Sequence, residues 1–153
     1  MATLKNSIGR LSSFAVVAAA LLAATAVHAV TVYQWKKRPL IVFAPSAGDA
    51  RLARQKTIVG GNRTAFLDRD VVVVYVVGGE ATHDLGPPPG MSAGALRTLY
   101  RASEGGFRVL LVGKDGGVKI DSAVPLAAAD VFAEIDRMPL RRDVMKTRSI
   151  VRP

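Results

Sequence analysis

The chain has 153 residues, no cysteine, and a formal net charge of +9 from 21 basic and 12 acidic side chains. The lack of cysteine excludes disulfide exchange, thiolate nucleophiles and cysteine-ligated metals, and the basic balance favours anionic partners. Nucleic acid is not expected as a partner, because aromatic residues do not alternate with the basic runs as base stacking would require.

The first 29 residues form a predicted secretory signal peptide. Lys5 and Arg10 give a positive start, residues 14–26 form an apolar run rich in alanine, and small residues follow. That order of charge, apolar run and small residues is typical of an export signal. We place cleavage after Ala29, with Ala26 as the second choice, and expect the mature protein to be periplasmic or secreted.

An uncleaved signal anchor is the alternative for this segment. Residues 14–32 approach the length of a single membrane span, and three basic residues follow at positions 36–38. If the signal is cleaved, the protein contacts the membrane only through this segment and only before cleavage. Removing residues 1–29 takes away two basic side chains and no acidic one, which leaves 19 basic against 12 acidic side chains and a net charge of +7.

The folded part is predicted to begin with a strand at residues 39–44, an apolar run with proline at its start and just after its end. A continuous run of this length is typical of a strand buried on both faces. Ser46, with Asp49 three residues later, resembles a capping box. It opens a predicted helix over residues 47–59, which a Gly-Gly pair ends.

The clearest strand of the sequence follows at residues 70–77, where six of eight residues are valine. Valine is stiff at χ1 and favours a pleated strand over a helix. Residues 78–90 are rich in glycine and proline and predict a loop. Ser92 is the expected cap of a helix that runs to Ala102.

The last elements are a hairpin and a helix. Apolar runs at residues 107–113 and 118–120 flank an Asp-Gly pair, which is a strong hairpin signal. Pro125 occupies the expected first position of a helix that ends at Met138. Residues 140–153 are basic, and we expect a short helical turn followed by a frayed tail.

This order of elements predicts an α/β protein: a single thioredoxin-like βαβαββα domain with a mixed central sheet flanked by helices. The domain spans residues 39–143, after a lead-in at residues 30–38 and before a basic tail at residues 144–153. Thiol chemistry on such a fold needs a thiolate near the start of the first helix. Thiol–disulfide oxidoreductase activity is therefore excluded, because the chain has no sulfur to ionise there.

Four runs of sequence carry a family resemblance, at residues 35–45, 68–74, 105–117 and 135–142. Together they resemble the domain of unknown function 4174 family across residues 35–143, and the most specific part is the run Phe-Arg-Val-Leu-Leu-Val-Gly-Lys-Asp-Gly-Gly. The resemblance implies a thioredoxin-like fold in an exported protein. It implies no established activity and no catalytic residues. The position of the cis-proline of thioredoxins corresponds here to Arg108.

Three residues form a candidate anion-binding surface: Ser46, Arg51 and Arg108. The free N–H groups of a helix start and its dipole favour an anion near Ser46. An arginine that begins the third strand would lie beside this helix start and could complete a small anion pocket with Arg51. The alternative for Arg108 is a structural ion pair with Asp49 or Asp115.

No catalytic or metal site is predicted. Ser46 would need a base to act as a nucleophile, and the mature chain has a single histidine, His83. Glu80, His83 and Asp84 could supply half of a metal site, but no second histidine or cysteine exists to complete a zinc shell. We expect no cofactor and no metal.

Two classes of function remain. The first is an exported, non-redox binding or structural module that contacts an anionic envelope component, a glycan or another protein. The second is an unrecognised hydrolase or transferase that acts on a small anionic substrate at the start of the first helix. An enzyme would need a convergent set of acid, base and nucleophile, and none is evident near that helix start. We favour the binding module.

Overall fold

Two apolar runs form the centre of a five-stranded sheet. The computed structural model describes residues 33–151, with side chains to residue 147. The predicted signal peptide and its cleavage site at Ala29 lie outside this range. Strand β1 (Arg38–Ala44) pairs in parallel with β2 (Val71–Val77), from Arg38 beside Val71 to Ala44 beside Val77. Both strands are almost fully buried, as unbroken apolar runs predict.

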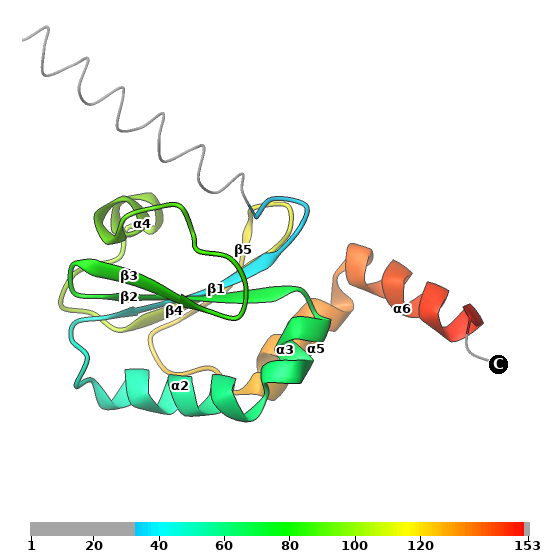
Figure 1. Cartoon of the computed structure of the whole chain (residues 1–153), viewed down its shortest axis with the longest axis horizontal. Coiled ribbons are helices and arrows are strands. Elements are labelled where there is room, and N and C mark those ends of the chain that lie inside the picture. The colour runs from blue at the N-terminus through cyan, green and yellow to red at the C-terminus, as the bar shows by residue number, and fades with distance from the viewer. Residues whose placement is uncertain (1–32, 152–153) are drawn as a thin grey trace, which may run out of the picture.

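Three antiparallel strands extend this parallel pair. Strand β4 (Arg108–Val112) lies beside β1, and β5 (Val118–Ser122) lies beside β4. Strand β3 (Glu80–Asp84) lies on the other edge, beside β2. The strand order is therefore β3-β2-β1-β4-β5, with β1 in the middle (Figure 1).

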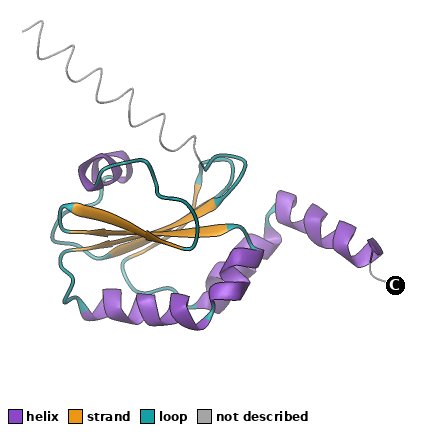
Figure 2. Cartoon of the chain, viewed as in Figure 1, coloured by secondary structure: helices purple, strands orange, loops and turns teal. Residues whose placement is uncertain are grey.

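Helices cover both faces of the sheet. Helices α2 (Ala50–Gly61), α3 (Arg63–Asp68) and α5 (Ala128–Arg137) lie on one face, and α4 (Ala93–Tyr100) lies on the other (Figure 2). Each face has its own apolar core. One core includes Leu52, Phe66 and Ile135, and the other includes Phe43 and Leu96. The predicted fold class is confirmed: a mixed sheet flanked by helices, consistent with a thioredoxin-like arrangement.

The structure corrects the predicted start of the first helix. Asp49, not Ser46, is the N-cap of α2, and its carboxylate accepts a hydrogen bond from the Arg51 N–H. Aspartate caps as well as serine, and in the turn before the helix the Asp49 N–H donates to the Ser46 carbonyl oxygen. The helix therefore begins at Ala50 and includes the two glycines at its end.

Four other features of the secondary structure differ from the prediction. The predicted loop at residues 78–90 contains β3, and α3 lies between α2 and β2. Helix α5 begins at Ala128 rather than at Pro125. The expected turn and tail after Leu140 are instead helix α6 (Pro139–Val151), which projects from the rest of the fold (Figure 1). No helix within residues 33–151 is long and apolar enough to cross a membrane.

Candidate functional site

The sheet separates the predicted anion-binding residues, because Arg51 and Arg108 lie on opposite faces of it. Arg108 pairs with Phe43 across the strands and belongs to the α4 face, while the neighbouring Phe107 belongs to the core of the opposite face. The Arg51 guanidinium lies over the Phe107 ring, 5.0 Å from its centroid. Arg51 and Arg108 therefore lie on opposite faces of the sheet, and Ser46 is exposed between β1 and α2.

Both arginines are held by carboxylates. Arg51 donates to Asp49 at 2.6 Å, and these hydrogen bonds hold the pKa of Asp49 at about 2. Arg108 donates to Asp121 at 2.6 Å, which lowers the pKa of that carboxyl, and also to the Tyr100 carbonyl oxygen. The expected structural ion pair of Arg108 thus exists, but its partner is Asp121 rather than Asp49 or Asp115.

The residues considered for metal binding belong to the edge strand β3. Glu80 and His83 are exposed, and Asp84 accepts two hydrogen bonds from Arg63 at 2.8 Å. No group of three potential metal ligands occurs among residues 33–147. His83 pairs with Val74 of β2. Val74 lies three residues before Val77, the end of β2 that pairs with Ala44. His83 is therefore roughly 10 Å along the sheet from the end near Ser46.

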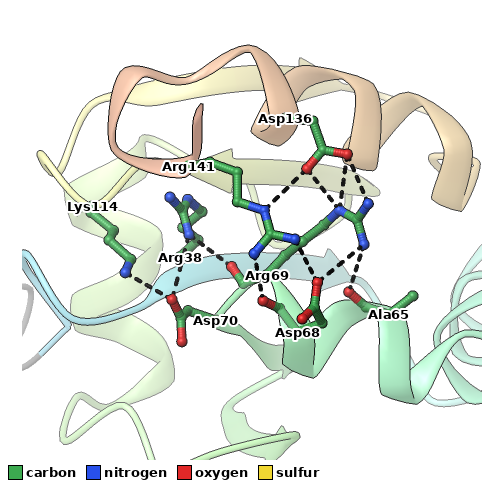
Figure 3. Close-up of polar contacts among 8 residues, drawn as sticks. All are labelled: Arg38, Ala65, Asp68, Arg69, Asp70, Lys114, Asp136 and Arg141. Carbon is green, nitrogen blue, oxygen red and sulfur yellow. Dashed lines mark hydrogen bonds and ion pairs between the residues drawn. The ribbon is translucent and has the colours of Figure 1, made fainter. Parts of the chain in front are cut away.

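The strongest cluster of charges lies at the opposite end of β1, where the strand begins. Here an arginine–aspartate network joins Arg38, Arg69 and Arg141 to Asp68, Asp70 and Asp136 (Figure 3). Arg69 donates to Asp136 at 2.7 Å, and Arg141 bonds to both Asp68 and Asp136. The network therefore ties α3 to the junction between α5 and α6.

The network has more cations than carboxylates. Lys114 donates to Asp70 at 2.8 Å, and Lys37 lies 3.8 Å from the same carboxylate. Within the described part of the chain, five cationic groups thus share three carboxylates. Arg38 is only 2% exposed, and burial lowers the pKa of its guanidinium. Its Nη1 donates to the Arg69 carbonyl oxygen, while its buried Nε finds no hydrogen-bond acceptor among the described residues.

A pocket of about 200 Å³ opens beside this network. Three chain segments form it: the turn before β1, the β4–β5 hairpin, and the junction of α5 and α6. A hydrogen bond of 2.7 Å from the Trp35 N–H to the Lys114 carbonyl oxygen joins the first two segments. We name it the Trp35 pocket, and its lining residues are Trp35, Arg38, Lys114, Asp115, Lys119, Met138, Pro139 and Leu140.

Trp35 is placed unusually for a tryptophan. The residue is 64% exposed, and its backbone has φ of 65°, in the left-handed region that residues other than glycine rarely adopt. Tryptophan is enriched among the residues that contribute most of the binding energy at protein interfaces. Trp35 therefore supplies an aromatic wall next to a cationic one.

The chain was compared with known protein families. The family model of a domain of unknown function, DUF4174, matches residues 30–143. The chain belongs to the DUF4174 family. No solved structure matches it. The whole lining of the Trp35 pocket lies inside the part of this DUF4174 chain that the family model covers.

Another buried arginine lies at the other end of the DUF4174 sheet. Arg97 of α4 donates to the carbonyl oxygens of Ala44, Gly78 and Ser103, and its guanidinium lies over the Phe43 ring. It is 6% exposed. Hydrogen bonds from a charged donor stabilise these strand ends. Arg97 thus has a structural role at the end of β1 that leads to α2.

Sequence reasoning missed the residues of the Trp35 pocket. Trp35 and Arg38 belong to the predicted lead-in at residues 30–38, and Lys114 belongs to the predicted hairpin turn. One signal was available. Arg38, Lys114 and Lys119 are basic residues next to apolar strands, and Lys114 belongs to the run that is most specific to the family.

Proposed function

We propose that this DUF4174 protein is an exported, non-redox, thioredoxin-like binding module that recognises an anionic group of an extracytoplasmic partner through the Trp35 pocket. The excess of cations in the network beside the pocket carries the proposal. Among the described residues, five cationic groups share three carboxylates there. An incoming anion would balance the excess positive charge of these groups.

Binding fits the pocket better than catalysis does. Its one carboxylate, Asp115, accepts a hydrogen bond from Lys119, which lowers the pKa of that carboxyl. A carboxylate with a lowered pKa is a weak general base near neutral pH. The lining has no histidine, serine or threonine to act as a base or nucleophile. The alternative of an enzyme at the first helix gains no support, because Ser46 and His83 are far apart.

Export is part of the proposal and rests on the sequence alone. The order of basic, apolar and small residues over positions 1–29 supports it. The charge of the mature chain agrees with a partner such as an acidic glycan or another anionic component of the envelope.

Retention on an immobilised sulfated glycan tests the binding role. Lys119→Gln removes one charge from the pocket, and Arg54→Gln removes one from the exposed face of α2 as the matched control. We expect Lys119→Gln to elute at clearly lower salt than Arg54→Gln, although both variants have the same net charge. Both should keep a cooperative thermal melt, since surface ion pairs contribute about 0–1 kcal/mol.

Equal elution of the two variants would show that retention follows net charge alone. The Trp35 pocket would then have no special role, and the proposal would fail.

A further inference from the structure

The Trp35 pocket has two chemically different sides. Trp35, Met138, Pro139 and Leu140 form an apolar side, and Leu140 keeps 47% of its surface exposed. The cationic side has Arg38, Lys114 and Lys119. A purely inorganic anion would leave the apolar side in water, and a neutral apolar molecule would leave the cations without a partner.

The cationic side has hydrogen-bond donors to spare. An ammonium group has three N–H donors. Among the described residues, Lys114 uses one on Asp70 and Lys119 uses one on Asp115. Both ammonium groups can therefore donate to a ligand without losing their present partners. A carboxylate has two oxygens, so one carboxylate could accept from both lysines.

The volume of the pocket limits the size of the ligand. A cavity of about 150 Å³ holds one benzene molecule, and pockets for larger organic ligands measure about 300–1,000 Å³. The Trp35 pocket, at about 200 Å³, lies between these limits and near the lower one. It has room for one phenyl ring or one branched chain together with a carboxylate.

We propose that the Trp35 pocket binds a small amphiphilic carboxylate, whose acid group lies against Lys114 and Lys119 and whose apolar body lies against Trp35, Met138 and Leu140. This inference rests on the proposed function and narrows its ligand class. The same chemistry occurs in a free aryl or branched-chain acid and in the last residue of a peptide with an apolar side chain.

The single tryptophan of the chain is Trp35, so its fluorescence reports on this pocket alone. Phenylacetate has the charge and the ring, phenylacetamide has only the ring, and acetate has only the charge. We expect phenylacetate to shift the Trp35 emission to shorter wavelength in a saturable manner. Phenylacetamide should bind at least about tenfold more weakly, the loss expected for one charge-assisted hydrogen bond. Acetate should also bind at least about tenfold more weakly, because it has no ring to bury against the apolar side.

Two variants assign the effect to the pocket. Lys119→Met keeps the aliphatic stem and should weaken phenylacetate at least about tenfold, whereas Arg54→Met on α2 should leave the affinity unchanged. A cooperative melt of each variant checks its fold. N-acetylphenylalanine distinguishes a free acid from the last residue of a peptide as the natural ligand. Its affinity should match that of phenylacetate only if the pocket accepts the end of a peptide.

The outcomes separate this inference from the proposed function. Equal responses to phenylacetate, phenylacetamide and acetate, or no saturable response, would overturn the amphiphilic carboxylate. Glycan retention that still depends on Lys119 would in that case leave the anion-binding function standing. Binding of phenylacetate that Lys119→Met does not weaken would also overturn the inference, because the acid group would not lie where we place it.

Discussion

Replacement of Val74 by aspartate should abolish cooperative folding at neutral pH. Val74 is 1% exposed, in the middle of β2, and packs in the core that α4 covers. Its strand neighbours are Ile41 of β1 and His83 of β3. An aspartate there would have to be neutral, because apolar surroundings disfavour the charged form and raise the pKa of a carboxyl.

The cost can be worked out in two parts. Protonation at pH 7 of a carboxyl with an ordinary pKa of about 3.9 costs about 4 kcal/mol, at 1.36 kcal/mol per pH unit. Loss of a buried valine costs about 1.5–3 kcal/mol more. The sum of about 6–7 kcal/mol is comparable with the whole stability of a domain, about 5–15 kcal/mol.

The pH dependence gives a sharper test. The folded pKa of the new carboxyl is raised, so the loss of stability grows as pH rises from about 4 and is smallest where both states bind the proton. Urea melts followed by circular dichroism should therefore show no cooperative transition for Val74→Asp at pH 7 and a recovered transition at pH 4, where the cost is about 4 kcal/mol smaller. The control is Val124→Asp, at a side chain 62% exposed, with an expected change within about 0.5 kcal/mol. A melt of Val74→Asp at pH 7 that matches this control would refute the central place of β2.

Four further predictions concern other parts of the chain. Asp49→Ala should lower the melting temperature by a few degrees through loss of the α2 cap, while Ser46→Ala should leave it unchanged; the reverse result would restore Ser46 as the cap. Burial raises the pKa of all three tyrosines, to about 12 for Tyr33 and Tyr75 and by an upward shift for Tyr100. Alkaline titration of the folded protein should therefore produce little tyrosinate near pH 10, and the stability that the protonated tyrosines contribute should be lost as pH rises above 10. N-terminal sequencing of the exported product should begin at Val30, and a full-length product in the membrane would indicate the anchor instead. Insulin reduction with dithiothreitol should be no faster than in buffer, since the chain has no thiol, and any rate that survives removal of contaminating reductases would contradict this.

The sequence predicted those elements whose patterns come from burial alone. The runs that became β1 and β2 are apolar along their whole length because both faces of the central strands are covered. The Asp-Gly pair placed the β4–β5 hairpin, and Ser92 caps α4 as expected, accepting from the Ala95 N–H. In each case a local pattern was sufficient to identify the element.

The elements that the sequence did not predict depend on contacts with residues that are distant in the chain. Strand β3 is an edge strand with mostly polar side chains, so its sequence has no apolar alternation. Helix α6 is polar and basic, and Arg141, which joins its start to Asp68 and Asp136, looks like any other residue of a basic tail. Burial of an arginine depends on partners that are distant in sequence, and a single sequence does not name them.

The same limit explains why the candidate site moved. The sequence argument used the start of the first helix, where local rules favour an anion. The Trp35 pocket needs three segments, at residues 35–38, 114–119 and 138–140, that only the folded chain brings together. The two surfaces lie at opposite ends of β1, which has seven residues and spans roughly 20 Å.

That separation makes one measurement decisive for the central claim that the Trp35 pocket binds anions. Amide chemical shifts of the isotope-labelled mature protein would be mapped during titration with sulfate, against chloride at equal ionic strength. We predict saturable, sulfate-specific shifts clustered at residues 35–38, 114–119 and 138–140, including the Trp35 indole N–H. Shifts clustered instead around Ser46, Arg51 and Arg108, or no difference between sulfate and chloride, would contradict the account.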